Sequence, residues 1–162
     1  MKEVIGVDPG LAGALVAITP DGLDLRVMPV VAAGGKHQYD EHVLVEWLTP
    51  YAIKRAHVFI EAVHAMPKQG VASMFTFGAG YGLLRGICSG LGLSYELVRP
   101  QEWQRAMLLG QPTGSEYLVA SRLWPNAEWC ASERCRKPHG GLVDAALIAE
   151  FGRRKLGMGS CS

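Results

Sequence analysis

Two apolar stretches near the start of the chain, residues 2–8 and 13–19, are joined by a turn sequence that contains Pro9 and Gly10. Valine and isoleucine favour strands, and Pro-Gly favours a tight turn, so these stretches predict an antiparallel strand pair. Within residues 4–18 the one charged side chain is Asp8, at the end of the first strand. A carboxylate there is costly unless N–H groups of the turn or a cation satisfy it.

The rest of the chain predicts further strands interleaved with helices. A turn at residues 19–22 precedes a third strand, 23–31, which completes an antiparallel meander, and residues 32–38 are expected to form a loop. Two more strands are expected at residues 57–62 and 93–98. Helices are expected from Asp40 to about Trp47 (before Pro50), over 71–91, from Pro100 through Trp103, over 115–124 and over 141–155, with an irregular loop at 126–138.

This order of elements predicts an α/β fold with a five-stranded mixed sheet flanked by helices. We expect one domain over residues 1–156 and a flexible tail over 157–162. The chain has 162 residues, of which 49% are hydrophobic and 19% charged, as in globular proteins. Its apolar stretches are far shorter than the ~20 residues of a membrane span, and no secretion signal is evident, so we expect a cytoplasmic protein without a membrane partner.

Charge and cysteine content say little about function. The formal net charge is +1, a weak argument for a nucleic-acid partner, although basic residues cluster at 134–137 and at 153–155. Solvated surface is the alternative interpretation of each cluster. The four cysteines form no dense disulfide framework, and the spacing of Cys130, Cys135 and His139 is not that of a zinc knuckle.

Three carboxylates lie at the margins of apolar elements. Asp8 ends the first strand, Glu61 ends the fourth, and Asp144 lies in the first turns of the last helix. Taken singly, each has a structural alternative: a cap for the Asp-Pro-Gly turn, a surface charge at a strand end, and a partner for a helix dipole. Taken together, they predict a Mg²⁺ site at one edge of the sheet, because Mg²⁺ prefers carboxylate oxygens.

These residues give the chain a resemblance to the RuvC-like Holliday junction resolvases, in particular the compact bacterial and phage-type group. It runs through "VIGVDPGLAGALVAI" (4–18), "VFIEAVHAMPKQGVASMFTFGAGYGLLRG" (58–86) and "HGGLVDAALIAEFGRR" (139–154). The most specific part is the pattern of glutamine, glycine, serine and phenylalanine between Gln69 and Gly82.

The resemblance implies an RNase H-like fold, a homodimer and a structure-selective endonuclease that acts in DNA recombination and repair. It implies paired symmetric nicks in four-way DNA junctions, with Mg²⁺ (or Mn²⁺) as cofactor, inside a bacterial or phage-infected cell. Asp8, Glu61 and Asp144 fall on the family's metal-binding carboxylates, with Asp8 bridging two ions and each of the others holding one. His139 is the nearest candidate for a fourth catalytic member, and its alternative is an ordinary loop histidine.

The chain departs from the family pattern at two places. Many relatives carry a carboxylate three or four residues before the last acid, where this chain has Gly141 and Gly140. Relatives often carry a lysine near the positions of Glu116 and Tyr117, and none stands there, so either Lys68 or an arginine substitutes for it or the activity is modest.

Two further segments are candidates for binding DNA or a second subunit. After Glu61, the loop residues His64, Lys68 and Gln69 are expected to contact the junction, by base stacking, phosphate pairing and hydrogen bonding; a plain connecting loop is the alternative. The glycine-rich helix 71–91 is expected to form a dimer seam, since small residues let helices approach closely, with core packing as the alternative.

Three other functions compete with the resolvase interpretation. The first is a non-catalytic protein that binds branched DNA, suggested by the glycines at 140 and 141. The second is an actin-like ATP-binding protein, which usually needs about twice this chain length. The third is a nuclease of the same fold that acts on RNA.

Overall fold

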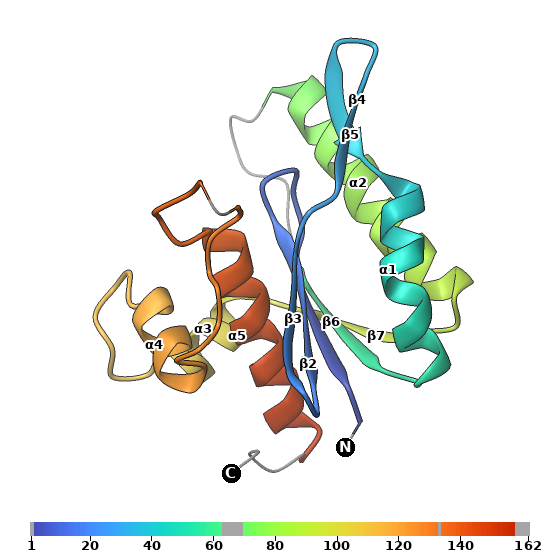
Figure 1. Cartoon of the computed structure of the whole chain (residues 1–162). Coiled ribbons are helices and arrows are strands. Elements are labelled where there is room, and N and C mark those ends of the chain that lie inside the picture. Colours follow the sequence, from blue (N-terminus) through green and yellow to red (C-terminus); the bar gives the residue numbers. More distant parts are fainter. Residues whose placement is uncertain (1, 63–69, 133, 158–162) are drawn as a thin grey trace.

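The computed structural model describes residues 2–62, 70–132 and 134–157. Five strands form one mixed sheet in the order β3-β2-β1-β6-β7, which confirms the predicted fold class (Figure 1). Its strands are β1 (Val4–Asp8), β2 (Ala14–Thr19), β3 (Gly22–Val27), β6 (His57–Glu61) and β7 (Ser94–Val98). The β1, β2 and β3 strands form the antiparallel meander, whereas β6 and β7 extend the sheet in parallel from β1.

Helices cover both faces of this sheet (Figure 1). One core cluster joins the sheet to α3 (Pro100–Met107), α4 (Glu116–Leu123) and α5 (Gly140–Lys155). The other joins the opposite face to α1 (Glu41–Ile53) and α2 (Val71–Gly90). Side chains alternate along the strands, so that Phe59 enters the first cluster while its neighbours Val58 and Ile60 enter the second.

Helix α5 lies directly against β1 because glycine occupies the contact. A Cβ at Gly6 would collide with the backbone of Ala145 and Ala149 in α5. A Cβ at Gly152 would likewise collide with the ring of Phe59 on β6. The helix therefore approaches the sheet closely at two points, and this close approach fixes its position.

A hairpin replaces the loop that we predicted at residues 32–38. It consists of β4 (Val30–Ala33) and β5 (Lys36–Tyr39), which form a separate two-stranded sheet. The predicted strand 23–31 is therefore wrong in its second half, because the chain leaves the main sheet after Val27. Gly34 and Gly35 both have positive φ, as a tight hairpin turn requires, so the Gly-Gly pair was the signal for two strands.

The sequence predicts that the first helix ends before Pro50, but in the structure α1 continues to Ile53. Asp40 caps its start as predicted, with Oδ1 accepting from the Val43 N–H at 3.1 Å. Beyond the proline, the last turn is held by Tyr51, which is buried and donates a hydrogen bond to Asp24. The burial of Tyr51 offsets the stability lost because Pro50 has no backbone N–H to donate within the helix.

In the described part of the chain, no helix combines the length and the apolar composition that crossing a membrane would require.

Replacing Gly6 by alanine tests whether α5 depends on the glycine contact. The new methyl group meets backbone atoms that cannot yield without moving the helix, so we expect Gly6→Ala to lower the free energy of unfolding by about 1–3 kcal/mol or more. Urea denaturation measures the change. Gly140→Ala is the control, because nothing lies within 4 Å of its added Cβ; equal stability of the two variants would refute the packing argument.

Candidate metal centre

The fold brings Asp8, Glu61 and Asp144 to one end of the sheet. Asp8 and Glu61 are the last residues of neighbouring parallel strands, and the register pairs Val7 with Ile60 directly before them. Asp144 is the fifth residue of α5, next to the Ala145 backbone that packs on Gly6 of β1. The sequence prediction that these acids converge therefore agrees with the positions of their elements.

The three carboxylates interact electrostatically. Burial, followed by the charges of Glu61 and Asp144, raises the pKa of Asp8 to about 8. Burial, followed by the charges of Glu61 and Glu116, raises the pKa of Asp144 to about 6. Burial also raises the pKa of Glu61. Among the described residues, no lysine or arginine is a cause that lowers any of these three pKa values.

Trp103 holds one of the carboxylates. Its indole N–H donates to Glu61 Oε1 at 2.8 Å, and its side chain is only 1% exposed. This hydrogen bond stabilises the ionised form and so partly opposes the rise in the pKa of Glu61. The sequence predicts a short helix that carries Trp103 but gives this residue no role, because its contact with Glu61 joins residues far apart in the chain.

The chemistry of these residues fits a divalent cation. Three carboxylates supply hard oxygen donors, and their mutual repulsion is relieved by a positive ion. As the described side chains stand, no three His, Cys, Asp or Glu residues are grouped closely enough to hold a metal ion. The donor type and charge therefore fit Mg²⁺, and binding requires the carboxylate side chains to close around it.

His139, the fourth predicted member, is the N-cap of α5. Its Nδ1 accepts the Leu142 N–H at 3.3 Å, and its backbone N–H donates to the Trp129 carbonyl at 2.7 Å. The structure therefore gives His139 a capping role at the start of the helix that carries Asp144. Its place in catalysis stays a prediction.

The glycines before Asp144 differ in their surroundings. A Cβ at Gly141 would lie 2.9 Å from backbone atoms of Ala12 and Gly13, in the turn between β1 and β2. A side chain at 141 would therefore push this turn away from α5. At Gly140 the space is open.

The predicted DNA contacts His64, Lys68 and Gln69 lie outside the described residues.

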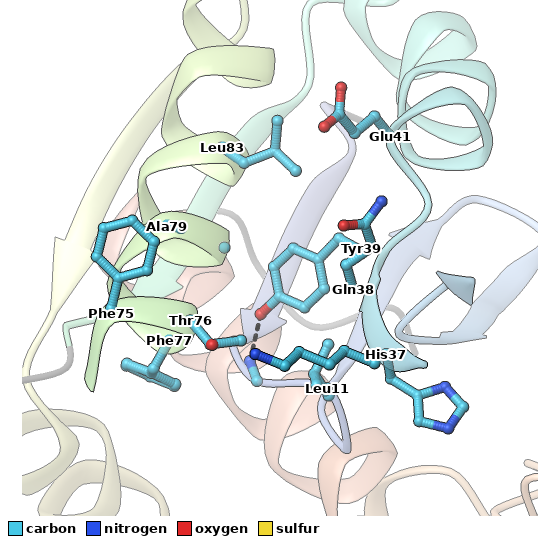
Figure 2. Close-up of a pocket in the computed structure, with 13 residues that line it drawn as sticks. Leu11, His37, Gln38, Tyr39, Glu41, Phe75, Thr76, Phe77, Ala79 and Leu83 are labelled. Carbon is cyan, nitrogen blue, oxygen red and sulfur yellow. Dashed lines mark hydrogen bonds between the residues drawn. The ribbon is translucent and has the colours of Figure 1, made fainter. Parts of the chain in front are cut away.

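A cavity of about 810 Å³ that the sequence did not predict lies between the β1–β2 turn, the β4–β5 hairpin and α2 (Figure 2). Tyr39 reaches across it from the hairpin, and its hydroxyl oxygen accepts the Gly10 N–H at 2.7 Å. Burial, opposed by this hydrogen bond, raises the pKa of Tyr39 to about 12, and the charge of Asp8 adds to the rise. The cavity therefore adjoins the turn that follows Asp8, and its aromatic walls include Phe77 of α2.

The raised pKa of Asp8 predicts how stability depends on pH without divalent ions. An acid whose pKa rises on folding holds its proton more tightly in the folded state, so stability falls as pH rises from about 4 through about 8. Asp8→Asn removes this loss. We expect the variant to melt roughly 3–8 °C above the wild type at pH 9 in EDTA, and the two melting temperatures to converge near pH 4. Thermal melts across this range measure it; parallel curves would contradict the assignment.

Comparison with solved structures identifies the fold. The chain is similar to Thermus thermophilus RuvC in complex with a Holliday junction substrate, with a TM-score of 0.60 and 15% identity over 98% of each chain. It is also similar to T. thermophilus RuvC in another structure, with a TM-score of 0.58 and 17% identity over 96% of this chain and 97% of that one. No protein-family model and no curated protein sequence matches the chain. The protein therefore has the RNase H-like fold of RuvC.

Proposed function

We propose that this protein is a metal-dependent endonuclease that cuts four-way DNA junctions. The observation that carries the proposal is the convergence of Asp8, Glu61 and Asp144 from three elements, with raised pKa values and no basic side chain among the causes that lower them. The likeness to a RuvC structure solved with a Holliday junction substrate supports the choice of DNA substrate.

In the proposed mechanism the three carboxylates would hold Mg²⁺, with Mn²⁺ as an alternative. The bound ion would supply charge neutralisation at the scissile phosphate and acidify the attacking water. Trp103 orients Glu61 through its N–H donor. The α5 cap uses Nδ1 of His139 as an acceptor, so its Nε2–H is the group that would assist the attacking water, by donating a hydrogen bond to it. His64, Lys68 and Gln69 follow Glu61 in the chain and are proposed to contact the junction.

We also propose that α2 pairs with its copy in a homodimer. Gly78, Gly82 and Gly86 are spaced four residues apart, are exposed, and have open space around an added Cβ. Phe75 lies on the same side of the helix and is 78% exposed. An exposed helix face of small residues flanked by an aromatic ring suits close contact with a second helix, and two-fold symmetry suits a substrate cut at paired positions.

A non-catalytic protein that binds branched DNA is the second candidate. The separation of the described carboxylates and the absence of a carboxylate at Gly140 and Gly141 favour it. Both candidates bind junctions, so strand cleavage separates them.

Cleavage of a synthetic four-way junction tests the main proposal. With Mg²⁺ we expect wild-type protein to nick the junction at paired positions and to spare linear duplex. Asp8→Asn should lower the cleavage rate by about 100-fold or more, because it removes a charge that the cation requires. Asp21→Asn makes the same chemical change at an exposed turn of the opposite end and should cleave normally. Tight junction binding without nicks in either Mg²⁺ or Mn²⁺ would establish the non-catalytic alternative.

A bulky residue on the glycine face tests the dimer. Gly82→Leu should keep the monomer folded, because the site is open to solvent, and should weaken self-association by about tenfold or more. Sedimentation equilibrium measures the change. Ala106→Leu places the same leucine side chain at an exposed position of α3 and should associate as the wild type does. A monomeric wild type, or equal association of both variants, would rule out this seam.

A further inference from the structure

The loop that leads into α5 carries three basic side chains close together in the sequence. Arg134, Arg136 and Lys137 are all exposed. Among the described residues none of them forms an ion pair. The acidic residues of the same loop, Glu128 and Glu133, both precede this run, so residues 134–137 carry three positive charges and no negative one.

The second basic cluster of the chain differs in this respect. Arg153 and Arg154 both bind Glu150, at 2.7 and 2.8 Å, and Lys155 binds Glu96 at 2.8 Å. Intramolecular partners thus neutralise the charges at the end of α5. Among residues 2–62, 70–132 and 134–157, no carboxylate pairs with the charges of residues 134–137, which can therefore meet an anion outside the protein.

The basic run sits on an ordered support. Trp129, earlier in the loop, is 6% exposed and packs on Trp124 with ring centroids 6.2 Å apart. The Cys135 N–H donates to the Ser132 carbonyl at 3.0 Å, and the backbone of His139 is tied to Trp129. Because both ends of the run are fixed, binding an anion there costs less conformational entropy than ordering a free tail would.

The run also lies at the carboxylate end of the molecule (Figure 1). It ends two residues before the N-cap of α5, the helix that holds Asp144 in its second turn. The paired cluster lies at the other end of this helix of 16 residues, about 24 Å away at 1.5 Å per residue. The unpaired charges of residues 134–137 therefore lie near the start of the helix that carries Asp144, and the paired charges of residues 153–155 lie at its other end.

We propose that Arg134, Arg136 and Lys137 bind the phosphate backbone of a DNA arm next to the scissile phosphate at the candidate metal centre. This inference rests on the proposed function, which it deepens by naming a binding surface. Guanidinium groups pair with phosphate oxygens in a bidentate manner, and each such contact releases counterions from DNA. This surface would contact only the charged backbone of the DNA, so its contribution to binding affinity is independent of base sequence.

The salt dependence of junction binding tests the proposal. Arg136→Gln/Lys137→Gln removes one arginine and one lysine from the run, and Arg154→Gln/Lys155→Gln removes the same pair of residue types from the neutralised cluster. Binding of a fluorescent four-way junction is measured by anisotropy in Ca²⁺ between 50 and 200 mM salt, after thermal melts confirm folding. We expect the first variant to lose about 2 units of slope in log K against log salt, at roughly 0.9 per phosphate contact. The control variant should keep the wild-type slope.

The outcomes separate this inference from the proposed function. If the wild type binds and cuts junctions but both variants keep its slope, residues 134–137 do not contact phosphate and the inference fails alone. If both variants lose the same slope, the charge effect is general and the surface is not specific to this loop, which also overturns it. If the wild type binds no junction, the proposed function fails and takes the inference with it.

Discussion

The contact between α5 and β1 is the constraint on which the candidate site depends. At Gly6 the backbone of the strand touches the backbone of the helix, with no side chain between them. Asp144 and Asp8 lie on these two elements, so the distance between the helix and strand backbones determines how close the two carboxylates are. A packed interior resists changes of even one methyl group, which makes this spacing a property of the fold rather than of flexible side chains.

The same arrangement explains why the acids are held in an unfavourable electrostatic state. Parallel pairing of β1 with β6 places two carboxylates at adjacent strand ends, and α5 adds the third. Repulsion between the carboxylates lowers the stability of the fold, and burial of apolar side chains in the two core clusters offsets this loss. A cluster of carboxylates without a counter-charge among the described residues is typical of sites that bind cations. In this fold, which is similar to that of RuvC, the cluster lies at the carboxyl ends of the parallel strands β1 and β6.

Much of this architecture follows from local sequence signals. Apolar runs with single terminal acids predicted β1 and β6 and the positions of Asp8 and Glu61, because strand periodicity and turn residues act over a few neighbours. The β4–β5 hairpin was missed because its strands are short and mostly exposed and show no alternation of apolar and polar residues. The continuation of α1 past Pro50 depends on burial of Tyr51, which is a tertiary contact. The tie between Trp103 and Glu61 joins residues 42 positions apart, and no local pattern reports such a contact.

The hydrogen bond between Trp103 and Glu61 links the candidate site to the hydrophobic core. Trp103 belongs to the core cluster beneath α5 as well as to the carboxylate site, so Glu61 is anchored to the interior of the protein. Any repacking around this indole, for example at its cluster neighbours Met107 or Val98, shifts the carboxylate that it holds. The position of the Glu61 carboxylate is therefore set from the hydrophobic core, by residues that lie outside the candidate metal centre.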